Sequence, residues 1–332
     1  MSLLLAGGER DGCAWYRVEV PARWLQRQGV EVRTAYAAQG DLTDQDLVVV
    51  QTFSSSRGID PTLVYATAIM QQRGIRVAYD VDDDLWAIPD WNPLKALWTG
   101  SMYKNLTSMI RLADVVTTTT EQLGATLELL NHRVQVIPNA LPREAFSDCD
   151  RSAHTGIRVG WAGSATHDKD LEQVHAALAQ LLLDRPDVTL VFMGWCPPVW
   201  ADYRARVESR PWVQPPMYYR ELESLDLDVF IAPLADCAFN RSKSDVKLLE
   251  AAAMGWPIVC TDFGPYAGGP DVVPGIRVPL DRPDRWVEAL TTLIRDAELR
   301  RMFGLDAWRH VSKHRTIDDT GPRWLRAFGV TA

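Results

Sequence analysis

Residues 157–193 read IRVGWAGSATHDKDLEQVHAALAQLLLDRPDVTLVFM, and their pattern points to the fold class. The stretch begins with a short apolar run, Ile157–Trp161, and ends with another, Val188–Met193, each typical of a buried strand. Between them, Asp168–Asp184 repeat apolar residues at helical spacing. The expected apolar face of this helix consists of Leu171, Val174, Leu178, Leu181 and Leu182. A strand, a helix and a strand in this order predict a parallel βαβ unit.

The same alternation runs along the rest of the chain. Several apolar runs are continuous, as expected for strands that helices cover on both faces. The further predicted strands are Leu3–Ala6, Val30–Arg33, Leu47–Gln51, Ile75–Asp80, Val115–Thr118, Val134–Ile137, Val229–Ala232 and Pro257–Thr261. Glycine follows each of the predicted helices 17–28, 61–73 and 244–254, and glycine readily adopts the left-handed conformation found at helix ends. This pattern predicts doubly wound α/β domains.

The alternation is interrupted at residues 141–155, which are polar, contain Pro142 and show no sustained period. We expect an interdomain linker there. It separates a Rossmann-like N-terminal domain, residues 1–145, from a Rossmann-like C-terminal domain, residues 156–315. The two are expected to face each other across a cleft, which is the usual position of a ligand site. Residues 316–332 form a last helix that is expected to pack back toward the first domain.

Composition excludes several classes of protein. The 332 residues carry a net charge of −8, and an acidic chain lacks the clustered Lys and Arg needed for non-specific binding to nucleic acid or anionic membranes. No apolar stretch approaches the about 18 residues of a transmembrane helix, and the N-terminus has no signal-peptide pattern. The five cysteines form no Cys-x-x-Cys pair, as expected for free thiols in a reducing compartment. We therefore expect a cytoplasmic protein without stable membrane insertion.

In open α/β sheets ligands bind beyond the carboxyl ends of the strands, so the loops after strands hold the candidate sites. The loop after Ile157–Trp161 contains small residues that let the backbone approach a ligand. The N-terminus of the following helix would favour a bound phosphate. The alternative is an ordinary turn in which Thr166 or Asp168 caps the helix.

A second loop, residues 239–250, concentrates positive charge in an acidic chain. Its cations are Arg241, Lys243 and Lys247. Ser244 is expected to cap the next helix, which places Lys247 in the first turn, where a cation opposes the helix dipole unless an anion is bound. Lys247 and Glu250 share a helix face, so one would meet a diphosphate while the other accepts hydrogen bonds from hydroxyls. The alternative is a solvated face in which Asp245 pairs with the lysines.

Two loops of the first domain also follow predicted strands. Residues 79–86, YDVDDDLW, cluster carboxylates that would suit a hard cation, substrate hydroxyls, acid–base chemistry or the capping of the next segment. Residues 7–17, GGERDGCAWYR, are glycine-rich, but they lack the Gly-x-Gly-x-x-Gly spacing of dinucleotide-binding enzymes. The sequence also contains no nucleophile elbow, Walker loop or zinc-ligand spacing.

Several segments together resemble the retaining, nucleotide-sugar-dependent glycosyltransferases of GT-B fold, known as group 1 glycosyltransferases. These segments are 136–140 (VIPNA), 159–164 (VGWAGS), 226–234 (DLDVFIAPL) and 247–259 (KLLEAAAMGWPIV). Residues 15–17 and 79–86 are similar to a bacterial and phage subset of these enzymes. The resemblance implies a GT-B-like fold with the sugar donor in the second domain and the acceptor on the first.

The resemblance also implies roles for individual residues. Glu250 matches the second Glu of the family's Glu-x7-Glu element, which contacts the donor ribose, and Lys247 lies near the donor diphosphate. We take these two as the catalytic residues. The expected donor-binding residues are Gly163, Ser164, His167, Lys169, Asn240, Arg241 and Lys243. The expected acceptor-side residues are Gly8, Tyr16, Arg17, Asp82 and Asp83.

One position departs from the family pattern. Ser242 stands eight residues before Glu250, where many members have a Glu near the transferred sugar, so the sugar itself stays open. The main chemical task is to stabilise the departing diphosphate with fixed cations and helix N–H groups. The resemblance implies a front-face reaction without a dedicated protein base. It also implies no cofactor and no required metal, which leaves Asp82 and Asp83 a non-metal role.

The predicted function is the transfer of a sugar from a nucleoside-diphosphate sugar to an acceptor, with retention. The acceptor is a glycan, a lipid-linked sugar, a protein or a modified nucleic acid. The alternative is a non-catalytic GT-B scaffold that binds a glycan or a protein partner, which Ser242 and the 13 tryptophans favour. A nicotinamide-dependent oxidoreductase is disfavoured by the glycine spacing.

Overall fold

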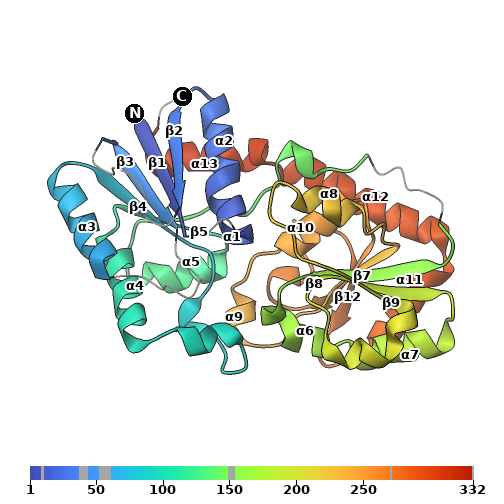
Figure 1. Ribbon diagram of the computed structural model, residues 1–332. Coiled ribbons are helices and arrows are strands. Elements are labelled where there is room, and N and C mark those ends of the chain that lie inside the picture. The colour runs from blue at the N-terminus through green and yellow to red at the C-terminus, as the bar shows by residue number, and fades with distance from the viewer. Residues whose placement is uncertain (9–10, 37–43, 52–60, 149–153, 270, 331–332) are drawn as a thin grey trace. The chain divides into compact units, whose positions relative to one another are not determined.

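The structure is a computed structural model in which residues 1–8, 11–36, 44–51, 61–148, 154–269 and 271–330 are described. The chain divides into two compact units. Unit 1 comprises Met1–Leu141, Arg241–Ser244 and Ile317–Ala332, and unit 2 comprises Pro142–Asn240 and Asp245–Thr316. Each unit contains one six-stranded parallel sheet and helices, which confirms the predicted two-domain α/β class (Figure 1).

The sheet of unit 1 has the strand order β2-β1-β3-β4-β5-β6, and every pair is parallel. The strands are β1 (Ser2–Gly7), β2 (Glu31–Tyr36), β3 (Leu47–Gln51), β4 (Arg76–Val81), β5 (Val115–Thr118) and β6 (Val134–Val136). The helices are α1 (Gly12–Ala14), the π-helical η1 (Trp15–Glu19), α2 (Val20–Arg27), α3 (Pro61–Gln72), η2 (Leu85–Ala87), η3 (Pro93–Leu97), α4 (Gly100–Leu112), α5 (Glu121–Glu128) and α13 (Ile317–Phe328). The chain adds β2 on one side of β1 and the later strands on the other, so the switch point of the sheet lies between β1 and β3. The loop after β1 therefore begins at the position where such sheets bind ligands.

Unit 2 has the order β12-β11-β10-β7-β8-β9, again with parallel pairs. Its strands are β7 (Ile157–Gly163), β8 (Val188–Gly194), β9 (Val207–Arg210), β10 (Val229–Ala232), β11 (Ile258–Asp262) and β12 (Ile276–Pro279). Its helices are η4 (Arg143–Ala145), η5 (Ala165–His167), α6 (Asp168–Glu172), α7 (His175–Asp184), η6 (Pro198–Arg206), α8 (Tyr218–Glu223), α9 (Ala238–Arg241, whose last residue belongs to unit 1), α10 (Val246–Ala253), η7 (Gly264–Tyr266), α11 (Arg285–Arg295) and α12 (Ala297–His314). This is the Rossmann order, and its switch point lies between β7 and β10.

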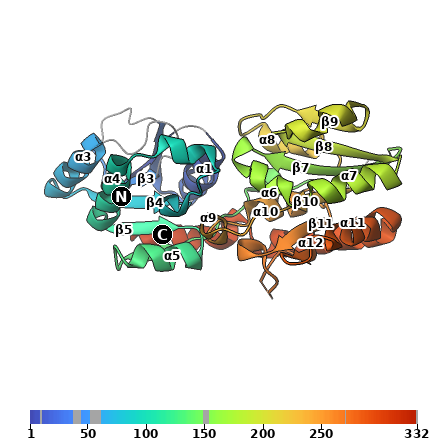
Figure 2. The same ribbon diagram turned by 90° about the horizontal axis from the view of Figure 1, so that it is seen from below.

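The core of unit 2 follows the two-residue period of its strands. Val229 and Ile231 of β10 join one buried cluster with apolar residues of α7 and α11. Phe230, between them, points to the opposite face, where its ring stacks on Trp256 at 6.0 Å. The predicted apolar face of 168–184 is buried in the first cluster, and Figure 2 shows α7 and α11 in unit 2 from below.

Two strands of unit 2 carry no signal that the sequence pattern could detect. Strands β9 and β12 are the two edges of their sheet, and most of their residues are only partly buried. An edge strand has a neighbour on one side only and needs no continuous apolar run. The ten strands expected from apolar runs are all present, which includes every central strand of both sheets.

Two further expectations are corrected. The single helix expected over 168–184 is divided into α6 and α7, with Gln173 and Val174 between them, and neither Gly nor Pro marks the break. The expected linker is packed where it is described, because Ala145 is fully buried and the N–H of Ser147 donates to the carbonyl of Ala253 at 3.1 Å. Residues 149–153 of that stretch lie outside the described residues.

The last helix, α13, packs inside unit 1 against α2 (Figure 1). Trp24 of α2 donates from Nε1 to Asp318 at 3.0 Å, and Arg76 donates to the carbonyl of Phe328 at 2.8 Å. Gly321 permits the close approach of the two helices, because a Cβ there would lie 2.3 Å from Cε2 of Trp24. The N- and C-terminal segments are thus joined by a glycine-to-indole contact.

We expect Gly321→Ala to lower the free energy of unfolding by ~1–3 kcal/mol, because the added methyl group overlaps the Trp24 ring and the helices must separate. Gly100→Ala is the matched control, since a Cβ at this helical position of unit 1 meets nothing within 4 Å. Urea unfolding of both variants measures the difference. Equal stability of the two variants would contradict the packing described here.

Candidate functional site

Helix α10 positions the two residues that the sequence places at the catalytic site. Its N-cap is Asp245, whose carboxylate accepts from the Arg315 guanidinium at 2.6 Å and makes no capping bond. The expected cap at Ser244 is therefore wrong, and the Ser244 hydroxyl instead accepts from Asn139 Nδ2 at 3.0 Å. Lys247 still falls in the first turn, and both Lys247 and Glu250 are buried, with exposed fractions of 9% and 6%.

The Lys247 ammonium lies at the carboxyl end of β7. Its Nζ donates to the carbonyl oxygen of Ala162 at 2.7 Å and sits 4.8 Å from the centre of the Trp161 ring. A Cβ at Gly163 would lie 2.5 Å from this Nζ and 2.6 Å from the Trp161 ring. Gly163 is therefore required for Lys247 to occupy its position, which is a sharper reason for the glycine than backbone approach to a ligand.

Glu250 is held from the other side by an aromatic pair. Tyr218 donates from its hydroxyl to Oε2 of Glu250 at 2.9 Å, and its ring lies 4.9 Å from that of Trp212. Burial and then the Glu250 charge raise the pKa of Tyr218 well above its usual value, so the phenol remains a hydrogen-bond donor. Trp212 itself is 39% exposed, which is unusual for an indole that packs on a buried tyrosine.

A second glycine closes the arrangement. Gly194 ends β8 opposite Gly163 in the strand register and has φ +91°. A Cβ there would lie 2.3 Å from the Gly163 carbonyl oxygen and 3.3 Å from Trp212. Lys247 thus lies against Gly163, Gly163 lies against Gly194, and Gly194 lies against Trp212. Trp212 packs on Tyr218, which donates to Glu250 of α10. We call these six residues the Lys247–Glu250 site: Gly163, Gly194, Trp212, Tyr218, Lys247 and Glu250.

Asp170 organises the neighbouring loops. Its carboxylate is almost fully buried, at 1% exposed, and lies 2.6 Å from Nδ1 of His167. The same carboxylate accepts from the N–H of Ala235 at 2.8 Å and from Nδ2 of Asn240 at 2.7 Å. It therefore ties the loop after β7 to the segment after β10, across the switch point of the sheet. The predicted donor residues His167 and Asn240 meet at this aspartate.

The other residues predicted in the loop after β7 point elsewhere. Lys169 forms an exposed ion pair with Glu172 of the same helix at 2.7 Å, and 46% of its side chain is exposed. The Ser164 hydroxyl lies 2.7 Å from that of Thr166 at the surface. Neither Thr166 nor Asp168 provides a side-chain cap for α6, and Asp168 accepts from Nε1 of Trp195 at 2.8 Å instead.

Residues 241–244 belong to unit 1, unlike Lys247. Lys243 donates to the carboxylate of Asp83 at 3.1 Å, and Thr120 donates to the carbonyl oxygen of Ser242 at 2.8 Å. Arg241 is exposed. Of the predicted cations of this loop, Lys243 is thus paired with an aspartate that the sequence assigns to the acceptor side.

Arg17 is buried in unit 1. Its guanidinium donates to Asp80 at 2.7 Å, and the two side chains are 1% and 0% exposed. It also donates to the carbonyl of Ile137 at 2.6 Å, and its Cζ lies 4.7 Å from the centre of the Trp324 ring. These contacts give Arg17 a structural role in unit 1, and breaking such a buried pair costs ~3–5 kcal/mol.

Asp82 lies at the carboxyl end of β4, beside the loop that follows β1. The Cys13 thiol of α1 hydrogen-bonds to its carboxylate. Burial, followed by the charges of Asp83 and Asp80, raises the pKa of Asp82 from 3.8 to about 7. Gly8 and Tyr16 lie in the same loop region, Gly8 partly buried and Tyr16 buried at the start of η1. The acceptor-side candidates other than Arg17 therefore come from the loops after β1 and β4.

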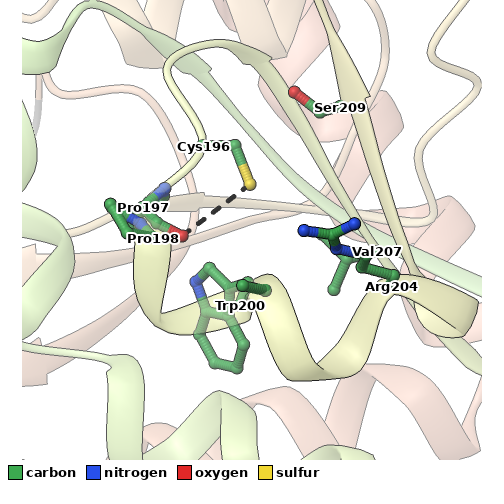
Figure 3. Close-up of a pocket in the computed structure, with 8 residues that line it drawn as sticks. Cys196, Pro197, Pro198, Trp200, Arg204, Val207 and Ser209 are labelled. Carbon is green, nitrogen blue, oxygen red and sulfur yellow. Dashed lines mark hydrogen bonds between the residues drawn. The ribbon is translucent and has the colours of Figure 1, made fainter.

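The remaining features of unit 2 lie apart from these residues. A pocket of about 250 Å³ opens beside η6, lined among others by Cys196, Trp200, Arg204 and Ser209 (Figure 3). It shares no residue with the Lys247–Glu250 site.

Within the described residues, no group of three or more His, Cys, Asp or Glu side chains is arranged to hold a metal ion. No helix in the described part of the chain is long and apolar enough to span a membrane.

Sequence reasoning missed Asp170, Gly194, Trp212 and Tyr218. Gly194 follows a predicted strand, and Asp170 lies in the first turn of the helix predicted over 168–184, so both carried a weak signal. Trp212 and Tyr218 follow the edge strand β9, which the pattern does not reveal. Their place beside Glu250 depends on tertiary packing alone.

Comparisons with known proteins find one family match and many solved structures of similar fold. Residues 156–296, which contain the whole Lys247–Glu250 site, match the family described as "Glycosyl transferases group 1". No curated protein sequence matches the chain. The chain has the fold of GT-B glycosyltransferases, which confirms the expected fold, and residues 156–296 are similar to group 1 glycosyltransferases, as the sequence motifs in this part of the chain predict.

Solved structures match along the whole chain. Sucrose-phosphate synthase from Thermosynechococcus elongatus is 13% identical with a TM-score of 0.69, covering 99% of this chain and 98% of that one. HepE from Anabaena, in complex with UDP and glucose, is 13% identical with a TM-score of 0.67, covering 99% of this chain and 100% of that one. An alpha-glucosyltransferase in complex with UDP and a 13-mer DNA containing a HMU base is 11% identical with a TM-score of 0.67, with 99% and 100% covered.

We expect Asp82→Asn to stabilise the protein relative to wild type, and to do so more at pH 8 than at pH 5. The pKa of Asp82 is about 7 in the folded protein and 3.8 in the unfolded chain, so between these pH values only the folded protein keeps the proton. The free energy of unfolding of wild type therefore falls as the pH rises from 3.8 to 7, and the loss is complete above pH 7. Removing the charge removes that cost. Thermal unfolding at both pH values should show the variant gaining at least about 2 °C on wild type at pH 8, the effect of ~1 kcal/mol in a domain of this size.

Asp46→Asn serves as the control. Hydrogen bonding to the Ser2 N–H lowers the pKa of Asp46 below 3.8, so this carboxylate is ionised at both pH values. Its substitution should change stability equally at pH 5 and pH 8. An Asp82→Asn effect that is likewise the same at both pH values would show that Asp82 does not titrate near neutrality.

Proposed function

We propose that the protein transfers a sugar from a nucleoside-diphosphate sugar to an acceptor hydroxyl, with retention of anomeric configuration. The observation that carries this proposal is the Lys247–Glu250 site, which lies within the residues that match group 1 glycosyltransferases. It combines a buried ammonium, a buried carboxylate and an exposed indole around two glycines. A phosphate, a ribose and a nucleobase need these three kinds of partner.

In the proposed complex, Lys247 binds the donor diphosphate, Glu250 accepts hydrogen bonds from the ribose hydroxyls, and the base stacks on Trp212. The six residues all belong to unit 2, so the donor would be held by one unit. The UDP named with HepE and with the alpha-glucosyltransferase supports a nucleoside diphosphate as the ligand. Asn240, Gly163 and Ser164 would border the diphosphate from neighbouring loops.

The proposed chemistry is leaving-group stabilisation. Negative charge develops on the diphosphate as its bond to the sugar breaks, and a fixed cation aimed at that oxygen is worth more in the transition state than in the bound donor. We propose that Lys247 supplies this charge without a metal ion or other cofactor. No protein base is assigned, since in a front-face reaction the departing phosphate accepts the acceptor proton.

The acceptor would bind to unit 1, at the loops after β1 and β4. Asp82 and Asp83 would accept hydrogen bonds from acceptor hydroxyls, with Gly8 and Tyr16 beside them. A glycan, a lipid-linked sugar, a protein and a modified nucleic acid all remain candidate acceptors, and the DNA named with one structural neighbour belongs to the last class. The four described cysteines are free thiols, which supports action in the reducing cytoplasm.

A thermal-shift screen tests the donor class. UDP-, GDP-, ADP- and dTDP-sugars are added to the full chain, with NAD as the control for an oxidoreductase. At least one nucleotide sugar is expected to raise the unfolding temperature, because a ligand that binds only the folded state stabilises it. Release of free nucleotide then distinguishes an enzyme from a non-catalytic scaffold. Stabilisation by NAD alone would overturn the proposal.

Lys247→Ala and Glu250→Ala are expected to reduce transfer from the donor identified in the screen by ~100-fold or more, the usual effect of removing a charge-stabilising group. Lys313→Ala and Glu298→Ala are the matched controls, because both side chains are exposed on α12 of the same unit. Initial rates of nucleotide release report the effect, and circular dichroism verifies folding. Wild-type turnover in either site variant would remove that residue from the site.

Gly163→Ala should impair transfer although no polar group is removed. The new methyl group would occupy the space of the Lys247 ammonium, which must move away from the diphosphate. Thermal stability is also expected to fall, because the same methyl group would lie 2.6 Å from the buried Trp161 ring. Gly269→Ala is the control in unit 2, where the nearest atom to an added Cβ is 3.4 Å away. Unchanged turnover in Gly163→Ala would show that the position of Nζ does not matter.

A further inference from the structure

The carboxylate of Asp170 is buried where the sheet of unit 2 changes direction. It lies between His167, the N–H of Ala235 and the side-chain amide of Asn240, at 2.6, 2.8 and 2.7 Å. The side chain is only 1% exposed, so water cannot replace these partners and each contact is costly to break.

His167 is the basic partner of Asp170. Its Nδ1 lies 2.6 Å from the carboxylate, which is a short hydrogen bond. The bond fixes the ring orientation and places a proton on Nδ1, as a carboxylate does for the histidine of many catalytic pairs. Nε2 is then the ring nitrogen that would face a ligand, and 15% of the side chain is exposed.

The histidine and the site lysine lie against one indole. The His167 ring is 6.2 Å from the Trp161 ring in an edge-to-face arrangement, and Nζ of Lys247 is 4.8 Å from the centre of the same ring. Trp161 is fully buried. The loop from Gly163 to His167 therefore carries a second basic group at the carboxyl end of β7, where Lys169 of the same loop is turned to solvent and paired with Glu172.

We propose that His167 is a catalytic residue that donates a hydrogen bond from Nε2 to the departing diphosphate, and that Asp170 is its positioning residue. This inference rests on the proposed donor site. In the step, the bond between the anomeric carbon and the diphosphate oxygen breaks, and its electron pair stays on that oxygen. The acceptor oxygen bonds to the anomeric carbon, and its proton goes to the departing diphosphate. His167 keeps its own proton throughout.

In the proposed role, His167 contacts the diphosphate of the donor and makes no contact with the nucleoside. Its removal should therefore weaken binding of the diphosphate part of the ligand and lower turnover, while contacts with the base and ribose remain. A residue that only supported the fold would affect both parts of the ligand alike. This difference separates a catalytic histidine from a structural one.

The test uses His167→Gln in the full chain. UDP, GDP, ADP and dTDP, each with its matching nucleoside, are titrated by calorimetry, and nucleotide release from the matching nucleotide sugar gives kcat and KM. We expect ~10-fold weaker binding of the diphosphate, unchanged binding of the nucleoside, and a kcat that is ~100-fold lower. His167→Lys should recover part of kcat, because its ammonium group also donates to a phosphate. His132→Gln is the matched control, an exposed histidine of unit 1.

Asp170→Asn keeps the size of the side chain and removes its charge. It should lower kcat by ~10-fold with a smaller change in KM, and nucleoside binding verifies that the variant is folded. Wild-type kcat in His167→Gln, or equal losses of nucleoside and diphosphate binding, would overturn the inference. If the wild-type protein binds none of the nucleotides, the proposed donor site fails, and the inference fails with it.

Discussion

The carboxylate of Asp170 is the contact on which the arrangement of unit 2 depends. The sheet supplies parallel strands whose loops end at one edge, but a sheet does not by itself fix how two loops on either side of a switch point approach each other. A buried anion that accepts from Ala235 and Asn240 and contacts His167 does so, because each hydrogen bond becomes costly to break once water is excluded. The loop after β7 is thereby held next to the residues after β10.

Unit 1 uses a comparable device with different residues. Asp80, near the end of β4, is fully buried and accepts from the Arg17 guanidinium and from the hydroxyl of Thr117 at 2.6 Å. Arg17 in turn donates to the chain after β6 through the carbonyl of Ile137. Buried charges of this kind add little net stability but strongly penalise any other arrangement of the same chain. Each unit thus positions its strand-end loops through one buried carboxylate.

Much of this architecture could be predicted from the sequence, and the rest could not for identifiable reasons. The central strands can be predicted from continuous apolar runs such as Leu47–Gln51, because both faces of these strands are covered. The edge strand β9 has no such run, so the sequence pattern misses β9 and also Trp212 and Tyr218, which follow it. Lys247, Glu250 and Gly163 could be singled out from the sequence because they are close to a predicted helix start or strand end. The burial of Arg17 could not be predicted, since no local pattern distinguishes an arginine that meets a ligand from one that meets Asp80.

The course of the chain has a consequence for how the protein is made. The chain enters unit 2 at Pro142, contributes 241–244 to unit 1, and returns to unit 1 for good at Ile317. Trp24 and Arg76 find their partners on Asp318 and Phe328, more than 240 residues later in the chain. Unit 1 therefore cannot finish folding when its first 141 residues leave the ribosome, although N-terminal domains usually fold first. The residues of unit 2 are synthesised before α13, and the α2 surface that receives α13 stays exposed until that helix has been made.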